Sequence, residues 1–376
     1  MTNENIEVII VKTRKQERQF ISFPFDLYKG DSCWVSLPKS ELMKSISRTK
    51  NPFFKEAIIE HFIVILEKEI TGRVSVTIHQ EYNIKYNTKT AFFGHFECIN
   101  DYRVVKAMMD RAILWAKDQD AVTNIKGPYS YCSTQEVGFL TTNFNEQPKF
   151  LQPYTKKYYP DLCKKYGFKE SFTASTYNVK SSYYNKSYTD FLEKYSQKLK
   201  KKHNFYVRSM DKKKIKSEIE IIRNLFNKSF YDNHEIVGIS RESFEFQISP
   251  LLKLVNPNFI RIIEKDNIAC AFVVMVPDLN EFFCYFKGLK RMMLPFFYKK
   301  FINNINSSVI ALIGTEPSLQ GSGLGRMLGN EIVKIARNLR ETSTMWIDDR
   351  NPNSWVLAKN SGMAKERTYV VLEKKI

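Results

Sequence analysis

The sequence predicts an α/β protein made of two halves with a similar plan. Strand-like and helix-like segments alternate twice along the 376 residues, which is enough chain for two domains of roughly 150 residues each. Hydrophobic residues make up 43% of the chain and charged residues 26%, as expected of a protein with a sizeable core. Each half is therefore predicted to form a mixed, twisted sheet flanked by helices.

The first half is predicted to contain strands joined by turns and helices. Strands are expected where apolar residues alternate or run together, at residues 7–11, 72–79, 91–98 and 172–179. Helices are expected where apolar residues share one face, at residues 102–117 and 160–166. The turn-rich stretch 81–89 predicts a connection between two paired strands.

The second half repeats this alternation. Strands are expected at residues 204–210, 259–264, 268–276, 309–313, 345–347 and 367–372. Helices are expected at residues 215–230, at 241–254, directly after the strand at 309–313, and before the closing strand. The apolar run 309–313 is short and uninterrupted, which is typical of a strand buried on both faces.

These patterns divide the chain into residues 1–180, a helical connector at 181–203, and residues 204–376. Between residues 194 and 216 there are ten Lys or Arg residues and one acidic residue, Asp211. A run of like charges is typical of a solvated surface, and it also suits anionic head groups or cofactor phosphates. Both interpretations remain open at this point.

Charge and cysteine usage limit the functional class. The net charge of +18 favours anionic partners such as nucleic acid, acidic lipids or a phosphorylated cofactor. The six cysteines and five histidines are scattered, so the sequence predicts reduced thiols in a cytoplasmic protein and no metal site. The chain starts without the basic-then-apolar order of a signal peptide, and no apolar run is long enough to span a membrane.

A glycine-rich stretch follows the buried strand and precedes an amphipathic helix. It consists of Gln320, Gly321, Ser322, Gly323, Leu324 and Gly325. The apolar face of the helix after it is formed by Leu324, Leu328, Ile332, Ile335 and Leu339. Glycines leave backbone N–H groups accessible at a helix start, where the helix dipole also favours an anion. The stretch therefore predicts a pyrophosphate site, with a merely tight turn as the alternative.

The stretch resembles the Q/R-x-x-G-x-G/A loop of the GNAT acyltransferases, with Gln320, Gly323 and Gly325 in register. Pro317 precedes the loop, and Asn351-Pro352-Asn353 opens a short helix ending at Gly362-Met363, as in that superfamily. The resemblance implies that the loop binds the pyrophosphate of an acyl-CoA. The residues it assigns to thioester binding are Ile313, Gly314, Thr315, Gln320, Gly321, Ser322, Gly323, Leu324, Gly325, Arg326 and Asn353.

Short motifs along nearly the whole chain resemble a bacterial family of two-part GNAT-like proteins. They include Gly72-Arg73-Val74, Phe92-Phe93-Gly94, Gly127-Pro128, Gly138-Phe139-Leu140, Tyr158-Tyr159-Pro160, Gly167-Phe168, Leu225-Phe226-Asn227 and Pro277-Asp278-Leu279-Asn280-Glu281. This family is similar to bacterial ceramide synthases, which acylate the amine of a sphingoid base from a thioester. No glycine loop lies between residues 117 and 140, so the first half is expected to be a degenerate copy that shapes a substrate cleft.

Amine acylation requires a base, donors for an oxyanion and an acid for the leaving thiolate. Candidate bases are Glu316 at a strand end, and Asp278 and Glu281, which flank Asn280. A surface or capping role is the alternative for each carboxylate. Backbone N–H groups near residues 313–315 are the oxyanion candidates on the resemblance. Many relatives carry a Tyr acid where this chain has Ala358, so the source of that proton stays open.

The stretch 289–300 interleaves basic residues with Met, Phe and Tyr. It predicts either a segment seated at an anionic membrane surface or an internal helix of the core. A membrane-facing segment would place the protein at the inner face of the membrane.

Taken together, the sequence predicts an acyl-CoA-dependent N-acyltransferase whose acceptor is an amine, with a sphingoid base as the candidate. A Fem-like aminoacyl transferase, which also pairs two GNAT-like domains, is the alternative enzyme. A membrane-binding or nucleic-acid-binding module is the alternative outside enzymes, although no nucleic-acid-binding motif is present.

Overall fold

The computed structural model describes residues 6–285, 301 and 304–376, apart from the side chains of residues 249, 250 and 252–254. The stretch 289–300, for which a membrane or core helix was expected, lies outside the described residues.

The strands of the first half are β1 (Ile6–Ile10), β2 (Ala57–Leu66), β3 (Glu69–His79), β4 (Thr90–Cys98), β5 (Asn124–Gly127), β6 (Phe139–Leu140) and β7 (Lys169–Lys180). Those of the second half are β8 (Phe205–Ser209), β9 (Ile260–Lys265), β10 (Ile268–Pro277), β11 (Ser307–Thr315), β12 (Glu341–Thr344), β13 (Ile347–Asp348) and β14 (Ala364–Lys375).

The helices of the first half are α1 (Arg14–Leu27), α2 (Lys39–Ser45), α3 (Gln80–Lys85), α4 (Tyr102–Gln119) and α5 (Tyr159–Lys165). After the connector helix α6 (Lys186–His203) come α7 (Ile215–Ser229), α8 (Arg241–Leu254), α9 (Leu279–Tyr285), α11 (Leu324–Ala336) and α12 (Pro352–Asn360). Short 3₁₀ turns are η1 (Pro52–Lys55), η2 (Ser181–Tyr183), η3 (Lys212–Lys214), η4 (Pro257–Phe259) and η6 (Pro317–Leu319).

All these strands join into one sheet, which runs through both halves. Its order is β1-β2-β3-β4-β5-β14-β7-β12-β11-β10-β9-β8, with β6 on β14 and β13 on β7. Read outward from the central β14–β7 pair, the two sides show the same pattern: one antiparallel pair, one parallel pair, then antiparallel pairs. The two halves are therefore two copies of one plan, as predicted.

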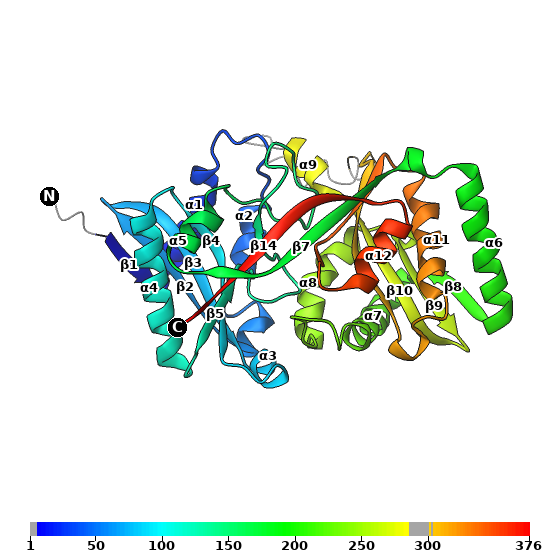
Figure 1. Ribbon diagram of the computed structural model, residues 1–376, viewed down its shortest axis with the longest axis horizontal. Helices are drawn as coiled ribbons and strands as arrows, with labels where there is room; N and C mark the ends of the chain where they lie inside the picture. Colours follow the sequence, from blue (N-terminus) through cyan, green and yellow to red (C-terminus); the bar gives the residue numbers. More distant parts are fainter. Residues whose placement is uncertain (1–5, 286–300, 302–303) are drawn as a thin grey trace.

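The halves exchange their closing strands. β14, at the C-terminal end of the described chain, pairs with β5 of the first half, whereas β7 of the first half pairs with β12 of the second. β7 and β14 also pair with each other and cross the middle of the molecule side by side (Figure 1). Each half-sheet is thus completed by the other half. The division of the chain near residue 180 stays a prediction, but the strands on its two sides are interlocked.

Helices cover both faces of the second half-sheet. Side chains of β11 alternate between the two faces, so Val309 packs in the core with α7 and α8, whereas Ile310 packs in the core with α6 and α11. Four of the five residues of the predicted apolar face lie on α11 and are buried, namely Leu324, Leu328, Ile332 and Ile335. The fifth, Leu339, lies beyond the end of the helix and is half-buried. In the first half, α4 packs against β2 and β3 of the sheet.

Several elements differ from the sequence expectation, and each difference has a physical cause. The predicted turn at 81–89 contains α3, whose Tyr82 is held by a hydrogen bond to Glu235 far along the chain. The predicted strand 345–347 is wrong in position, because β12 ends at Thr344 and consists of polar residues. These polar residues are accommodated inside the sheet by hydroxyl contacts such as Ser308 to Thr342 at 3.0 Å.

Two further elements, β2 and α1, were not predicted. The nearly continuous apolar run of β2 does not distinguish a strand from a buried helix. Helix α1 carries Pro24 in its interior, a residue that argues against a helix when only the sequence is read. In contrast, the predicted strands 259–264 and 268–276 are observed as the antiparallel pair β9 and β10, and Asp266 and Asn267 between them have the positive φ of a tight hairpin.

A buried carboxylate joins the two halves beside the central strands. Glu235 contacts Lys126 of β5 at 2.6 Å and accepts hydrogen bonds from Tyr82 at 2.9 Å and Tyr129 at 3.2 Å. Arg350 of the second half lies 3.2 Å from the same carboxylate. Burial alone would raise the pKa of Glu235, but the charge of Lys126 and the hydrogen bonds outweigh it, so the pKa lies below its usual value.

Replacing this carboxylate should destabilise the fold in a pH-dependent way. Glu235→Gln leaves Lys126 buried without a counter-charge, so we expect the free energy of unfolding to fall by about 3 kcal/mol at neutral pH. Because the folded pKa is depressed, the contribution of Glu235 is present above the unfolded pKa of about 4.3 and is lost as the pH falls through the folded pKa. Urea unfolding at a series of pH values measures this. A difference from wild type that does not shrink in acid would contradict the assignment.

Candidate active site

The glycine loop, residues 320–325, connects the turn η6 to α11. Gly321 has φ +79° and Gly323 has φ +93°, a region that favours glycine. Gly323 is the N-cap residue, and its carbonyl accepts hydrogen bonds from the N–H groups of Arg326 and Met327. The loop therefore turns sharply and starts the helix without a side-chain cap.

Several amides of this loop are unbonded. Among the described residues, the N–H groups of Gly321, Gly323, Leu324 and Gly325 have no hydrogen-bond partner. Ser322 differs, because its N–H and its hydroxyl both donate to the carbonyl of Leu319. The free amides lie at the positive end of the dipole of the 13-residue helix α11. This arrangement is a ready anion site.

The loop is open on one side and packed on the other. A side-chain carbon at Gly321 would meet nothing within 4 Å, and one at Gly325 would meet only Leu357 at 3.7 Å. At Gly323, in contrast, it would lie 2.6 Å from the hydroxyl of Tyr195 and 2.8 Å from Leu199, both on α6. The anion site therefore opens toward Gly321 and Gly325.

The other residues assigned to thioester binding are divided between the cavity and the surface. Gln320 and Asn353 line the cavity described below. Leu324 belongs to the core and is 1% exposed. Arg326 is exposed and lies over the ring of Tyr195, 5.2 Å from its centre.

A wedge opens in the sheet next to the loop. The parallel pairing of β11 with β12 ends at Ile310 and Thr344, although β11 continues to Thr315 alongside β10. The register with β10 skips Ala311, which marks a β-bulge at that point. We call residues 311–315 and 345–348 the second-half wedge.

The wedge leaves strand amides available. Consecutive N–H groups of a strand point to opposite edges, so among Ile313, Gly314 and Thr315 at least one N–H points away from β10 and into the wedge. This is where the sequence placed the oxyanion donors. A residue that the sequence did not indicate lies beside them: the buried hydroxyl of Ser229 has no partner among the described residues, and it lies next to Gly314.

The wedge and the loop open into a cavity of about 1740 Å³ that both halves line. Ligand sites of ordinary size are about 300–1,000 Å³, so this cavity has room for a ligand with a long chain. Its apolar lining includes Phe150, Phe226, Phe230, Leu251 and Phe282. Ala358, at the position where relatives carry a Tyr, also lines the cavity and supplies no hydroxyl.

The carboxylates proposed as bases lie at opposite ends of β11. Glu316 follows the strand directly, next to the cavity-lining residues Thr315 and Pro317. Its carboxylate pairs with Lys228 of α7 at 3.2 Å. Asp278, Asn280 and Glu281 lie beside Ser307 at the other end, about 26 Å away at the usual rise of 3.3 Å per residue.

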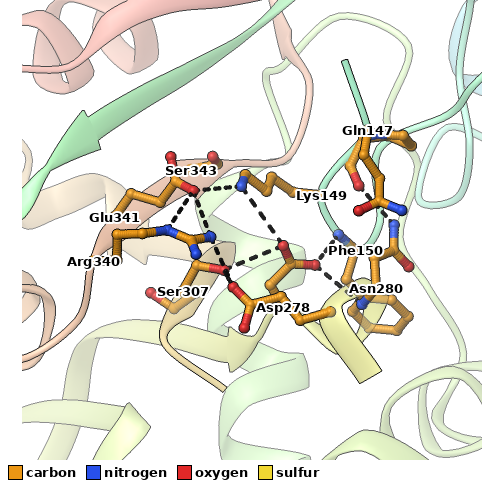
Figure 2. A network of polar contacts seen from close by, with 12 residues as sticks. Gln147, Lys149, Phe150, Asp278, Asn280, Ser307, Arg340, Glu341 and Ser343 are labelled. Atoms are coloured by element: carbon orange, nitrogen blue, oxygen red, sulfur yellow. Dashed lines mark hydrogen bonds and ion pairs between the residues drawn. The ribbon is translucent and has the colours of Figure 1, made fainter. Parts of the chain in front are cut away.

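Asp278 is the centre of a polar network (Figure 2). Its carboxylate accepts from the backbone N–H groups of Phe150 at 2.8 Å and Asn280 at 3.1 Å, and Lys149 lies 3.9 Å away. Burial raises the pKa of Asp278 despite these contacts. The network ties the start of β11 to a loop of the first half.

Glu281 and Asn280 extend the same network. Glu281 accepts from the hydroxyl of Ser307, from the N–H of Asn306 and from Arg340. The side-chain amide of Asn280 donates to the carbonyl of Pro148 at 2.9 Å, and Asn280 is the member of this trio that lines the cavity.

The described residues contain no group of three or more His, Cys, Asp or Glu side chains that could hold a metal ion. None of the six cysteines, all of which are among the described residues, forms a disulfide bond. In the described part of the chain, no helix has both the length and the apolar character needed to cross a membrane.

Comparison with known proteins gives relatives at low sequence identity. No protein-family model matches this chain. The chain is 26% identical to protein YghO of Escherichia coli over 351 residues, which cover 92% of this chain and 87% of that protein. It is 24% identical to the bacterial ceramide synthase of Caulobacter vibrioides over 389 residues, covering 99% of this chain and 98% of that protein.

Solved structures match the whole chain. A tandem GNAT protein from the clavulanic acid biosynthesis pathway superposes with a TM-score of 0.57 at 9% identity, covering 99% of this chain and 98% of that chain. This chain has the tandem GNAT fold. A GCN5-related glucosamine N-acetyltransferase region of a fungal multi-domain GH3 β-N-acetylglucosaminidase gives a TM-score of 0.59 at 12% identity, and the match covers 100% of this chain and 38% of that larger chain.

These findings confirm the predicted fold, with two GNAT-like domains of mixed sheet flanked by helices. They also confirm the predicted similarity to bacterial ceramide synthase over nearly the full length. In the tandem GNAT fold of this chain, the glycine loop and its wedge belong to the second half. The roles of individual residues remain proposals.

The position of Asp278 predicts a structural role. Asp278→Asn removes the negative charge beside Lys149 and weakens the hydrogen bonds from the N–H groups of Phe150 and Asn280. We therefore expect the free energy of unfolding to fall by about 2 kcal/mol. The affinity for coenzyme A, measured by calorimetry, should stay unchanged. If the variant instead unfolds in urea as the wild-type protein does but has lost its activity, Asp278 would again be a candidate for the catalytic base.

Proposed function

We propose that this protein is an acyl-CoA-dependent N-acyltransferase, which transfers an acyl group from a thioester to an amine. The unbonded amides of Gly321, Gly323 and Gly325 at the start of α11 carry this proposal. Gly321 and Gly325 line the cavity, next to the point where the second-half wedge opens in the sheet. A diphosphate on these amides would place the pantetheine arm and its thioester along the second-half wedge.

In this proposal the acyl transfer takes place in the second-half wedge. The neutral amine attacks the thioester carbonyl and forms a C–N bond, which gives a tetrahedral intermediate. The C–S bond breaks when this intermediate collapses. We assign donation to the oxyanion of this intermediate to those N–H groups of residues 313–315 that point into the wedge and to the hydroxyl of Ser229, which lies next to Gly314. Coenzyme A leaves as a thiolate and takes up the proton that the attacking nitrogen gives up, either directly or by way of the base and water.

Glu316 is our candidate for the base, acting directly or through a water molecule. It lies at the loop end of β11, and its pair with Lys228 is partly exposed, so opening that pair costs little. Asp278, Asn280 and Glu281 are proposed to hold the start of β11 in place, because their polar atoms are engaged in hydrogen bonds about 26 Å from Thr315 by strand rise.

A long-chain amine, such as a sphingoid base, is the proposed acceptor. The cavity of about 1740 Å³ with its aromatic and aliphatic lining suits two long chains, one from each substrate. A relative aligned over 99% of this chain is named as a bacterial ceramide synthase, which supports the same acceptor class. The Fem-like alternative is less well supported, because this chain keeps the glycine loop intact.

We also propose a cytoplasmic location with peripheral contact to anionic membranes. Exposed lysines at the end of α6 and in η3 form the basic run between residues 194 and 216. Such a surface would bring the enzyme to lipid substrates by attraction to anionic head groups.

A negative charge introduced at Gly325 should weaken the binding of a diphosphate without preventing folding. Gly325 has open space around it and helical geometry, so Gly325→Asp and its uncharged match Gly325→Asn should both fold. Asp near a helix start is itself favourable to the helix. We expect coenzyme A affinity to fall at least about 50-fold in Gly325→Asp and much less in Gly325→Asn, because a carboxylate repels the diphosphate.

Isothermal titration calorimetry with coenzyme A measures this difference. Equal affinities for the two variants would contradict the diphosphate site. Incubation of the wild-type protein with acyl-CoAs of varied length and an amine panel that includes sphinganine, with mass detection, tests the reaction itself.

The hydroxyl of Ser229 should contribute to the chemical step. Ser229→Ala removes one proposed oxyanion donor, so we expect kcat to fall about 10- to 100-fold while coenzyme A affinity stays unchanged. Ser217→Ala on the exposed side of the same helix is the matched control. Steady-state kinetics with saturating amine provide the comparison, and an unchanged kcat in Ser229→Ala would remove the residue from the mechanism.

A further inference from the structure

The first half has a wedge of its own. The parallel pairing of β4 with β5 ends at Phe92 and Lys126, and the register of β4 with β3 is interrupted between Arg73 and Ser75. His95 lies at this bulge with φ +45°, an unusual value for a residue with a side chain. We call residues 94–97 with 130–131 the first-half wedge.

This wedge is not a second diphosphate site. The helix that follows β4, α4, is capped by Asp101, whose carboxylate accepts a hydrogen bond from the N–H of Arg103 at 2.8 Å. A carboxylate thus occupies the position that a ligand anion would take. The first-half wedge still lines the same cavity as the second, so it is available to the other substrate.

Two ionisable side chains near the first-half wedge, Arg73 and Glu136, have few hydrogen-bond partners. Arg73 is 9% exposed and lines the cavity, yet its Nε has no partner among the described residues. Its Nη1 donates to the carbonyl of Phe20 at 2.9 Å, and Nη2 lies 4.0 Å from Glu97. Glu136 also lines the cavity, where its side chain is exposed and accepts from the hydroxyl of Ser130 at 3.0 Å.

A second carboxyl group, that of Glu97, lies near Arg73. Glu97 accepts from the phenols of Tyr28 at 2.9 Å and Tyr159 at 2.6 Å. Burial and the nearby Arg73 keep the pKa of His95 well below its usual value, so this side chain is neutral.

The second histidine of the cluster adds no charge either. Burial, with help from Arg48 and Arg73, lowers the pKa of His61 to about 3. Arg73 therefore has the carboxyl groups of Glu97 and Glu136 near it. A ligand with one positive charge and a neighbouring acceptor atom would complete this set.

We propose that Glu136 and Arg73 form the head-group site of the acceptor amine, where Glu136 binds the ammonium and Arg73 donates from Nε to an oxygen on the adjacent carbon. This assignment rests on the proposed N-acyltransferase function. The ligand class is a long-chain amine with a neighbouring hydroxyl or carbonyl. Glu136 and Arg73 are binding residues here, and no chemical step is assigned to them.

The two wedges are close enough for this site to serve the reaction. The carbonyl of Gln135, next to Glu136, accepts a hydrogen bond from the indole of Trp346 at 3.2 Å. Trp346 belongs to the second-half wedge, directly beyond the last paired residue of β12. An amine held by Glu136 therefore lies beside the wedge proposed for the thioester.

Calorimetry with sphinganine and octadecylamine in detergent micelles tests the site without requiring turnover. Octadecylamine has the same chain length and charge but lacks the neighbouring oxygen. For the wild-type protein we expect sphinganine to bind roughly 10-fold or more tightly than octadecylamine. Glu136→Gln should weaken both amines about 10- to 100-fold, since it removes the counter-charge and keeps the shape. Glu146→Gln, an exposed carboxylate outside the cavity lining, is the control.

Coenzyme A affinity in the same variants separates this site from the donor site. Wild-type coenzyme A affinity in Glu136→Gln, together with weakened amine binding, supports the assignment even if no transfer activity is found. Unchanged amine affinity in Glu136→Gln overturns it, and so does a parallel loss of amine and coenzyme A binding. Equal affinity of the wild-type protein for the two amines overturns the role of Arg73.

Discussion

The pairing of β7 with β14 at the centre of the sheet is the constraint on which the rest of the structure depends. Because each closing strand completes the sheet of the other half, the two wedges are held at fixed positions across one cavity. Glu235 reinforces this joint through contacts with Lys126 and Arg350 from the two halves. The wall of the cavity is thus built from both copies.

The same plan has two different helix starts, and these decide what each half can bind. In the second half the chain turns through Gly321 and Gly323 and leaves amides free at the head of α11. In the first half Asp101 caps α4 with its own carboxylate. The physical difference is one side-chain anion at the positive end of a helix dipole. For this reason the start of α11 offers free N–H groups to an anion, whereas the start of α4 already holds the carboxylate of Asp101.

Burial and hydrogen bonding also separate the carboxylates by role. Asp278 and Glu235 are buried and accept several hydrogen bonds, which is typical of groups that hold a fold together. Glu136 lies in the cavity wall, where its side chain is exposed, accepts a hydrogen bond from Ser130 and has no ion-pair partner among the described residues. A bound ammonium would supply that missing charge.

The sequence by itself determined the alternation of strands and helices, the repetition of the plan, the apolar face of α11 and the glycine loop, because these depend on spacing between near neighbours. Only the tertiary structure decided the exchange of β7 and β14, the burial of the polar strand β12 and the distance of Asp278 from the loop. It alone brought Gln135 to Trp346, 211 residues away, and left Arg73 with an unpaired nitrogen in the cavity wall. Such contacts depend on how distant segments pack together, and the spacing of residues within one segment does not indicate this.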